Sequence, residues 1–186
     1  KPAIVIINNA NLGTIGAGFF VTADGSIVTC AHVVGQAVGT GTSLNFVISN
    51  QFYIEINNPN GTVPTSPNSY VVSVVNNGSN IIVDAAGDIA VIKIPGIATQ
   101  QFLSWGNSLT YTRGSPVCCI GAPQDIDIMS IATGVVRNNQ FVYGPSFSPL
   151  ECILTDIASY PGNSGGPILD QTGLVVGILG FGCLVG

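Results

Sequence analysis

A serine stands among glycines near the C-terminal end of the chain, in the segment Pro161–Pro167 (PGNSGGP). Glycines on both sides let the backbone turn sharply, which presents the Ser164 hydroxyl and aims neighbouring N–H groups into one small space. The N–H groups of Gly162 and Ser164 are suited to bind the oxyanion that forms when a serine attacks an acyl group. The segment therefore predicts a nucleophilic serine; the alternative is an ordinary Gly-Pro turn.

The chain contains one histidine, His32, in the segment Thr29–Val34 (TCAHVV), at the end of a β-rich run that begins in a hairpin around Asp24–Gly25. A neutral imidazole can take the proton of a serine and return it to a leaving amine. A single histidine is often a structural residue. Here a serine hydrolase would need a base, and no second histidine is available, so His32 is the predicted general base.

A carboxylate is needed to orient such an imidazole through its second nitrogen and to stabilise the imidazolium. Two candidates lie four residues apart, Asp84 and Asp88. Asp88 is preferred because it directly precedes the apolar strand predicted at Ile89–Ile92. The alternative for either residue is a carboxylate that only shapes a turn.

The elements that would position these residues read as strands and turns. Val, Ile and Thr are frequent beside 24 Gly and 11 Pro, which favours many short strands in a sandwich or barrel. One helical turn is expected near residues 31–35, and a connector at 95–102. Residues 57–80 are rich in Asn, Pro, Gly and Ser and predict a surface loop with one strand inside it. Strands are predicted at 16–22, 26–30, 44–48, 51–56, 70–75, 89–94, 115–120, 128–136, 140–143, 152–155, 167–169 and 174–179.

Charge is scarce along the chain. Asp, Glu, Lys and Arg make up 7% of the residues, with a net charge of −5, against roughly 25% charged residues in an ordinary domain. Without a basic stripe to neutralise phosphates, nucleic acid is excluded as a partner. So uncharged a surface predicts association with a larger assembly or self-association. No transmembrane segment is predicted.

Five cysteines occur, at positions 30, 118, 119, 152 and 183, so at least one is unpaired within the chain. Buried free thiols are the preferred interpretation. With no CxxC motif and one histidine, neither a metal site nor a cofactor is predicted. Two Asn-x-Ser/Thr sequons, at Asn60 and Asn77, favour a location outside the cytosol.

The segments above, in this order, resemble the trypsin-like serine peptidases, and among them the HtrA/DegP-type protease domains. The similarity runs from Gly16 to about Gly182. The matching segments are Gly16–Gly25 for the first hairpin, Thr29–Val34 for the histidine, Asp88–Lys93 for the aspartate strand, Phe102–Ser108 and Arg113–Pro123 for the start of the second barrel, and Thr133–Val136 and Thr155–Pro167 after it. The glycine-rich serine motif is the most specific of them.

The resemblance implies an all-β fold of two six-stranded antiparallel Greek-key β-barrels, at residues 1–95 and 96–186, with the active site in the cleft between them. It implies the order His32, Asp88, Ser164 for a catalytic triad. Substrate would bind as an extended strand along Gly180, Phe181 and Gly182. The floor of the specificity pocket would lie near Ala158 and Ser159.

The chain departs from the digestive members of the family at Asn163, where those members have an aspartate. An activating pair between that residue and a new N-terminal ammonium is therefore not expected. The interval from His32 to Asp88 is also long, and the polar loop at 57–80 accounts for the excess.

The sequence thus predicts a serine endopeptidase that acts on peptide or protein substrates through an acyl-enzyme intermediate. The expected pocket contains no acid, so an apolar residue before the scissile bond is predicted. Two alternatives stay open. The first is a catalytically silent peptidase fold that serves as a structural or binding module, which the low charge and odd cysteine count favour. The second is a hydrolase of non-peptide esters.

Overall fold

The computed structural model describes residues 3–56, 69–73, 80–94, 96, 101–123, 129–143 and 150–180. Strands dominate this part of the chain. The elements in order are β1 (Ile4–Asn9), β2 (Thr14–Phe20), β3 (Ser26–Cys30), α1 (Ala31–Val34), β4 (Gly35–Val38), η1 (Gly41–Ser43), β5 (Asn45–Ile48), β6 (Gln51–Ile56), β7 (Ser69–Ser73), β8 (Ile81–Asp84), β9 (Ile89–Lys93), η2 (Ser108–Thr110), β10 (Pro116–Gly121), β11 (Ser130–Tyr143), β12 (Leu150–Thr155), β13 (Pro167–Leu169) and β14 (Val175–Ile178). No helix among the described residues is long and apolar enough to cross a bilayer.

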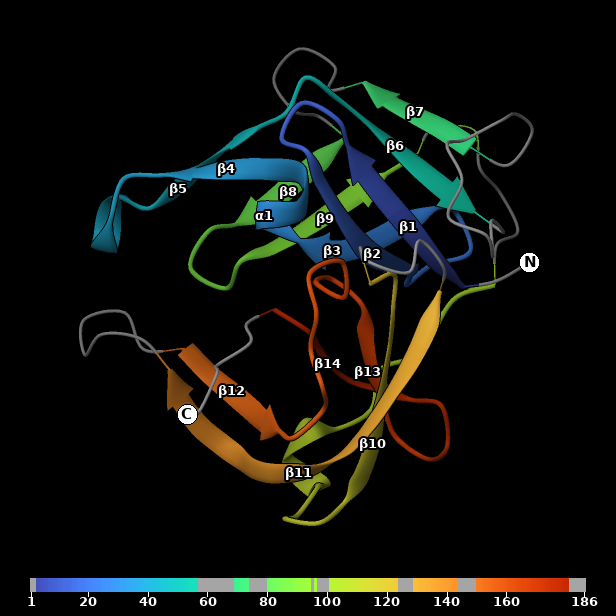
Figure 1. Ribbon diagram of the computed structural model, residues 1–186, viewed down its shortest axis with the longest axis vertical. Coiled ribbons are helices and arrows are strands. Elements are labelled where there is room, and N and C mark those ends of the chain that lie inside the picture. Colours follow the sequence, from blue (N-terminus) through green and yellow to red (C-terminus); the bar gives the residue numbers. More distant parts are fainter. Residues whose placement is uncertain are drawn as a thin grey trace.

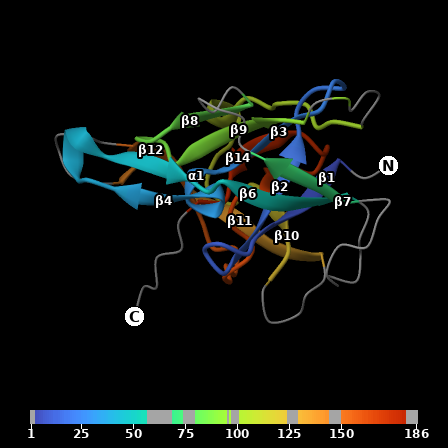
Figure 2. The same ribbon diagram turned by 90° about the horizontal axis from the view of Figure 1, so that it is seen from above.

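The strands form two curled sheets and a separate ribbon (Figure 1; Figure 2). The first sheet has seven strands in the order β7-β6-β1-β2-β3-β9-β8, the second has five in the order β12-β11-β10-β13-β14, and β4 pairs with β5 alone. Each sheet contains a Greek key, because β6 returns beside β1 and β13 returns beside β10. The predicted all-β double-barrel architecture is confirmed.

The strand numbers differ from the expected six and six. In the described residues β7 pairs with β6 and adds an outer strand to the first sheet. The second sheet also merges two predicted strands, 128–136 and 140–143, into the single strand β11. Register shifts in its pairing with β12, between Val136 and Asn138 and between Asn138 and Phe141, show how bulges let one long strand bend instead of ending.

The hairpin between β2 and β3 follows its turn chemistry. Gly25 adopts a φ of 95°, and Val21 N–H donates to Ser26 O at 2.9 Å to close the turn. Asp24 also accepts a 2.5 Å hydrogen bond from Thr22 Oγ1. A left-handed residue is readily supplied by glycine, so Gly25 lets β3 return beside β2 and run towards His32. The predicted hairpin is confirmed.

The position of β1 was not predicted from the sequence. This strand lies inside the first sheet, paired with both β2 and β6. Val5 and Ile7 are fully buried there. A short apolar run without strict alternation does not distinguish a buried strand from other buried segments, so this central strand is determined by its partners.

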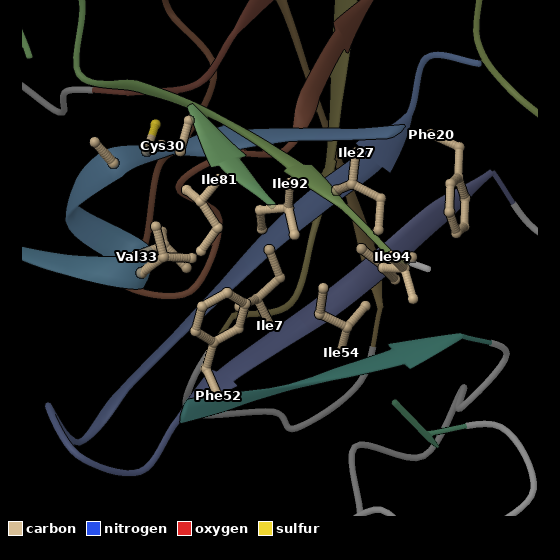
Figure 3. Packing of buried hydrophobic residues seen from close by; sticks show 14 of the residues in the cluster. Ile7, Phe20, Ile27, Cys30, Val33, Phe52, Ile54, Ile81, Ile92 and Ile94 are labelled. Atoms are coloured by element: carbon tan, nitrogen blue, oxygen red, sulfur yellow. The ribbon is translucent and has the colours of Figure 1, made fainter. Parts of the chain in front are cut away.

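The two sheets have separate cores and a shared seam. Figure 3 shows the first core, in which Val33 of the turn α1 belongs to one cluster with Ile7, Phe20 and Phe52. The second core is smaller and includes Val117, Cys119, Val136, Ile157, Ile168, Val176 and Leu179. A third cluster joins β2 and β3 to β13 and β14 through Phe19, Val28, Leu169 and Val175. This seam fixes the first sheet against the second, on the side where the candidate residues lie.

Candidate active site

His32 lies in the single turn α1, which follows β3 without a break. The other side chains of the turn are buried in the first core, whereas the His32 side chain is 40% exposed. The carbonyl of Val33 accepts hydrogen bonds from Asn9 Nδ2 at 3.2 Å and from Thr14 Oγ1 at 3.4 Å. These contacts hold the turn, so that the imidazole is presented at the edge of the first core.

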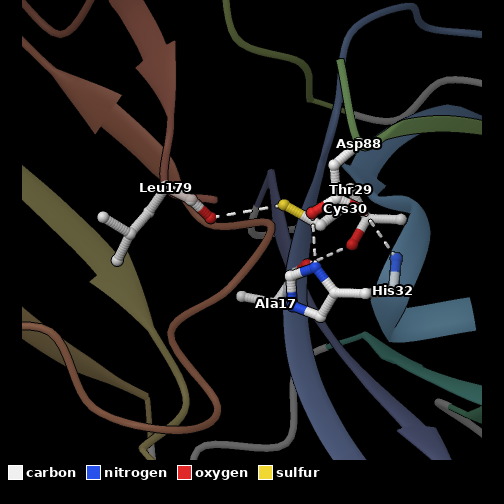
Figure 4. A network of polar contacts seen from close by, with 6 residues as sticks. All are labelled: Ala17, Thr29, Cys30, His32, Asp88 and Leu179. Carbon is white, nitrogen blue, oxygen red and sulfur yellow. Dashed lines mark hydrogen bonds and ion pairs between the residues drawn. The ribbon is translucent and has the colours of Figure 1, made fainter. Parts of the chain in front are cut away.

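Asp88 is bound to the histidine segment by three hydrogen bonds, and Figure 4 shows those between its carboxylate and His32. Its carbonyl accepts from Ala31 N–H at 2.9 Å, its Oδ1 accepts from His32 N–H at 2.9 Å, and its Oδ2 lies 2.5 Å from His32 Nδ1. Asp88 is 5% exposed and has a φ of 52°, positive for a non-glycine residue. Such a backbone costs about 1–3 kcal/mol and persists only where its surroundings fix it, as the three bonds do here.

Asp84 has a different role. It is exposed, and its Oδ1 accepts hydrogen bonds from Ala86 N–H at 3.1 Å and Gly87 N–H at 3.3 Å. This is the usual way in which an aspartate closes its own turn. The structure therefore brings Asp88, and not Asp84, against His32.

The turn around Ser164 is shaped by its backbone. Gly162 and Gly165 have φ values of 99° and 83°. Asn163 N–H donates to Tyr160 O, and Gly166 N–H donates to Asn163 O, both at 3.0 Å. The N–H groups of Gly162 and Ser164 donate to no carbonyl in the described part of the chain. The use of these two N–H groups as oxyanion donors stays a prediction.

The glycines of this turn are required by close packing as well as by φ. A Cβ added to Gly165 would fall under 3.0 Å from Ala17 O and from Thr29 Oγ1. A Cβ on Gly166 would fall equally close to Ile120 O. The first of these contacts joins the turn directly to β2 and β3, so the serine turn is seated on the first sheet.

Ser164 meets the histidine segment at this junction. Its carbonyl accepts a hydrogen bond from Ala17 N–H at 2.8 Å. A Cβ on the neighbouring Gly16 would contact both Ser164 O and the Val33 side chain, which adjoins His32 in sequence. Among the described residues no hydrogen bond links Ser164 Oγ to His32. The structure thus joins His32 directly to Asp88, and it joins the backbone of Ser164 to β2 at a point that the Val33 side chain also borders.

Asn163, which directly precedes Ser164, is buried in the serine turn. It is 2% exposed, its Oδ1 has no hydrogen-bond partner in the described part of the chain, and that oxygen packs against Gly121. An unpaired neutral amide oxygen is much less costly to bury than an unpaired carboxylate. An asparagine at this position is therefore consistent with a turn that forms without a buried ion pair.

One cluster has metal-ligand chemistry, since Cys30 Sγ, a His32 ring nitrogen and an Asp88 oxygen lie within 4.8 Å of one another. Burial, and after it the charge of Asp88, raises the pKa of the Cys30 thiol well above its usual range. A thiol that keeps its proton is a poor metal ligand, and His32 and Asp88 already share a hydrogen bond. The cluster therefore fits a hydrogen-bonded arrangement better than a metal site.

The predicted specificity residues are partly described. Ala158 and Ser159 are exposed in the segment that follows β12, and Gly180 is half-buried next to Cys30. Phe181 and Gly182 lie outside the described residues. None of the three described positions carries a charge.

Sequence reasoning missed the residues that seat the serine turn on the first sheet, namely Ala17, Thr29 and Cys30. Thr29 Oγ1 donates to Ala17 O at 2.7 Å, and both atoms border the Cβ position of Gly165. Thr29 and Cys30 precede His32 in the same motif, which could have drawn attention to them. Nothing in the sequence around Ala17 indicates this contact.

Comparison with known proteins agrees with this geometry. The family model for the trypsin-like peptidase domain matches residues 16–178. The magnetosome formation protease MamE of Magnetospirillum gryphiswaldense is 30% identical over 88% of this chain and 18% of its own length. The serine protease HTRA1 of Xenopus laevis is 31% identical over 88% of this chain and 30% of its own. A probable periplasmic serine endoprotease, DegP-like, of Pseudomonas savastanoi is 30% identical over 89% of this chain and 28% of its own.

A solved structure shows the same fold. The HtrA-type protease AlgW with tripeptide superposes with a TM-score of 0.67 at 20% identity, covering 95% of this chain and 50% of that one. The present chain thus spans less than a third of the three relatives and half of this structure. From the family match over most of its length, the chain belongs to the trypsin-like peptidase domains, and it is similar to proteases of the HtrA type.

Proposed function

We propose that the chain is the catalytic domain of a serine endopeptidase, in which Ser164 is the nucleophile, His32 the general base and Asp88 the residue that orients the imidazole. The observation that carries the proposal is the junction at which the Ser164 turn is seated on the first sheet beside the hydrogen-bonded His32–Asp88 pair. Relatives named as serine proteases share this region of the chain.

The hydrogen bond between His32 and Asp88 supports the following scheme of proton transfers. Because His32 Nδ1 lies 2.5 Å from Asp88 Oδ2, that nitrogen holds a proton towards the carboxylate, which leaves Nε2 to accept the proton of Ser164. Ser164 Oγ then attacks the substrate carbonyl. His32 returns the proton to the leaving amine, and water hydrolyses the acyl-enzyme by the reverse transfers. Catalytic hydrogen bonds to a serine are often loose without substrate and tighten in the complex.

The developing oxyanion is assigned to the N–H groups of Gly162 and Ser164. Both are without a carbonyl partner in the described residues, while Asn163, Gly165 and Gly166 use theirs to hold the turn. Donors that are already fixed need no reorganisation when charge develops, and one such donor typically contributes about 10²–10³-fold to turnover.

For specificity, we propose an apolar residue before the scissile bond, bound where Ala158, Ser159 and Gly180 lie. None of these residues offers a charge to a Lys or Arg side chain, and the absence of a side chain at Gly180 leaves space there. Cleavage of a randomised peptide library tests this: enrichment of apolar residues is expected, and a profile dominated by Arg or Lys would overturn it.

A location outside the cytosol is part of the proposal. It is supported by the two sequons and by a relative whose name describes a periplasmic enzyme. Association with a larger assembly stays a prediction from the low charge, and sedimentation of the purified chain as a monomer would argue against it.

The decisive experiment is labelling with a fluorophosphonate probe, followed by mapping of the labelled peptide. Parent protein and Ser104→Ala, which alters an exposed serine outside the site, should label at Ser164. Ser164→Ala should not label and should lose peptide hydrolysis by about 10⁶-fold. A folded parent that does not label would contradict the proposal and leave the structural-module interpretation. Labelling combined with hydrolysis of esters but not peptides would favour the ester hydrolase.

A further inference from the structure

The carbonyl of Leu179 accepts two hydrogen bonds that arrive from different sheets, and Figure 4 shows the one from Cys30. The Cys30 thiol, at the end of β3, donates to it at 3.4 Å. Gly165 N–H, directly after the candidate nucleophile, donates to it at 2.8 Å. Leu179 N–H in turn donates to Gly166 O at 2.9 Å. One carbonyl therefore connects the histidine segment with the serine turn.

The surroundings of Cys30 suit a fixed donor. The residue is 2% exposed, and Asp88 lies close enough for its charge to contribute to the raised pKa of the thiol, after the larger effect of burial. The thiol therefore keeps its proton and can donate. Gly180 leaves room for the sulfur, since even an added Cβ would stop 3.8 Å from Cys30 Sγ. A Cβ on Gly165 would lie 3.0 Å from Cys30 N, so the two segments touch along their backbones too.

We propose that Cys30 is a positioning residue, whose thiol holds Leu179 and, through it, the Ser164 turn in register with the His32–Asp88 pair. The inference rests on the proposed endopeptidase function. Cys30 is two residues before His32, and Leu179 leads into Gly180, the first residue of the predicted substrate strand. The thiol thus links the general base to the nucleophile and to the start of that strand, and does not contact the reacting atoms itself.

The rate of reaction should depend on this link more than substrate binding does, because small misplacements of reacting groups are costly. Cys30→Ala removes the donor without leaving Leu179 O unpaired, because Gly165 N–H still binds it. The variant should therefore fold. We expect its kcat and its rate of fluorophosphonate labelling to fall about three- to tenfold, the effect of losing one weak hydrogen bond at a reacting centre. KM should stay within about twofold.

Two further variants separate positioning from general stability. Cys30→Ser restores an O–H donor and should recover at least part of kcat. Cys119→Ala is the matched control: this thiol is 1% exposed and borders Gly166, but it comes from β10 in the second sheet and does not join the two sheets. Cys119→Ala should lower the melting temperature as much as Cys30→Ala does, with kcat unchanged.

Amide hydrogen exchange of residues 160–166 and 179–180 provides a readout that does not need activity. Exchange should accelerate in Cys30→Ala and not in Cys119→Ala. Equal exchange in the two variants, or a kcat that falls with stability in both, would refute the positioning role even if the parent is an active peptidase. If exchange is faster only in Cys30→Ala, but the parent protein never labels with the fluorophosphonate probe, the endopeptidase proposal is refuted and the structural link is kept.

Discussion

The two halves of the candidate site are held by different kinds of contact. On the first sheet, hydrogen bonds from His32 to the buried carboxylate of Asp88 hold the imidazole, and Asp88 has a positive φ where it accepts them. On the second sheet, the Ser164 turn depends on glycines whose missing side chains allow close backbone contact. The first half should therefore be sensitive to changes in chemistry at constant shape, and the second to changes in volume at constant chemistry.

The strongest test of this contrast is Asp88→Asn. Asparagine tolerates a positive φ at least as well as aspartate does, and it keeps an oxygen for His32 N–H, so folding should be preserved. Its amide would face His32 Nδ1 with a donor and favour the wrong tautomer. We expect kcat for a peptide substrate to fall by about 10⁴-fold, with the urea midpoint close to that of the parent.

Asp84→Asn is the control for this change, because Asp84 only caps its own turn. Its kcat should remain within about twofold of the parent. An equal loss in both variants, or a larger loss at Asp84, would contradict the assignment of the orienting carboxylate.

The second half of the contrast is tested by Gly165→Ala. The added methyl group meets Ala17 O and Thr29 Oγ1 at a position whose φ is 83°. Overlap with fixed backbone and an unfavourable φ together should cost about 3–5 kcal/mol of unfolding free energy, measured by urea denaturation. Failure of the Gly165→Ala variant to fold would also agree with the expected loss of stability.

Gly173→Ala separates the two causes. Gly173 has nearly the same φ, 84°, but a Cβ there would meet nothing within 4 Å. This variant should lose only the backbone term, about 1 kcal/mol. Similar losses at Gly165 and Gly173 would show that conformation alone, and not close packing, makes the serine turn depend on glycine.

A smaller effect is expected away from the site, at the 2.5 Å hydrogen bond from Tyr111 OH to Asp170 Oδ2. This bond is the largest cause that lowers the pKa of Asp170 from 3.8 to about 2. A carboxyl whose pKa is lower in the folded than in the unfolded state stabilises the protein at pH values above its unfolded pKa. This stabilisation is lost as the pH falls through the folded pKa. Tyr111→Phe should therefore lower the urea midpoint slightly near neutral pH, and the difference from the parent should shrink between pH 3.8 and about 2.

Urea denaturation across this pH range measures the difference. Tyr53→Phe is the control, because this half-buried tyrosine of β6 makes no side-chain hydrogen bond among the described residues. A Tyr111→Phe effect that stays constant down to pH 2, or a matching effect in Tyr53→Phe, would show that the hydrogen bond to Asp170 is not the cause.

The local features of this protein could be predicted from its amino-acid sequence alone. The Asp24–Gly25 hairpin, the helical turn at His32, most strand positions and the glycine-rich serine turn follow from residue types that act on their own backbone and immediate neighbours. Such signals need no knowledge of the remaining chain, which is why the all-β class and the candidate nucleophile and base could be predicted.

The relations between distant segments depend on the tertiary structure. It placed β1 between β2 and β6, and it joined Cys30 to Leu179 across 149 residues. It also distinguished Gly165, which is packed against the first sheet, from Gly173, which is not. These outcomes depend on which surfaces meet when the two sheets pack, and no local pattern carries that information.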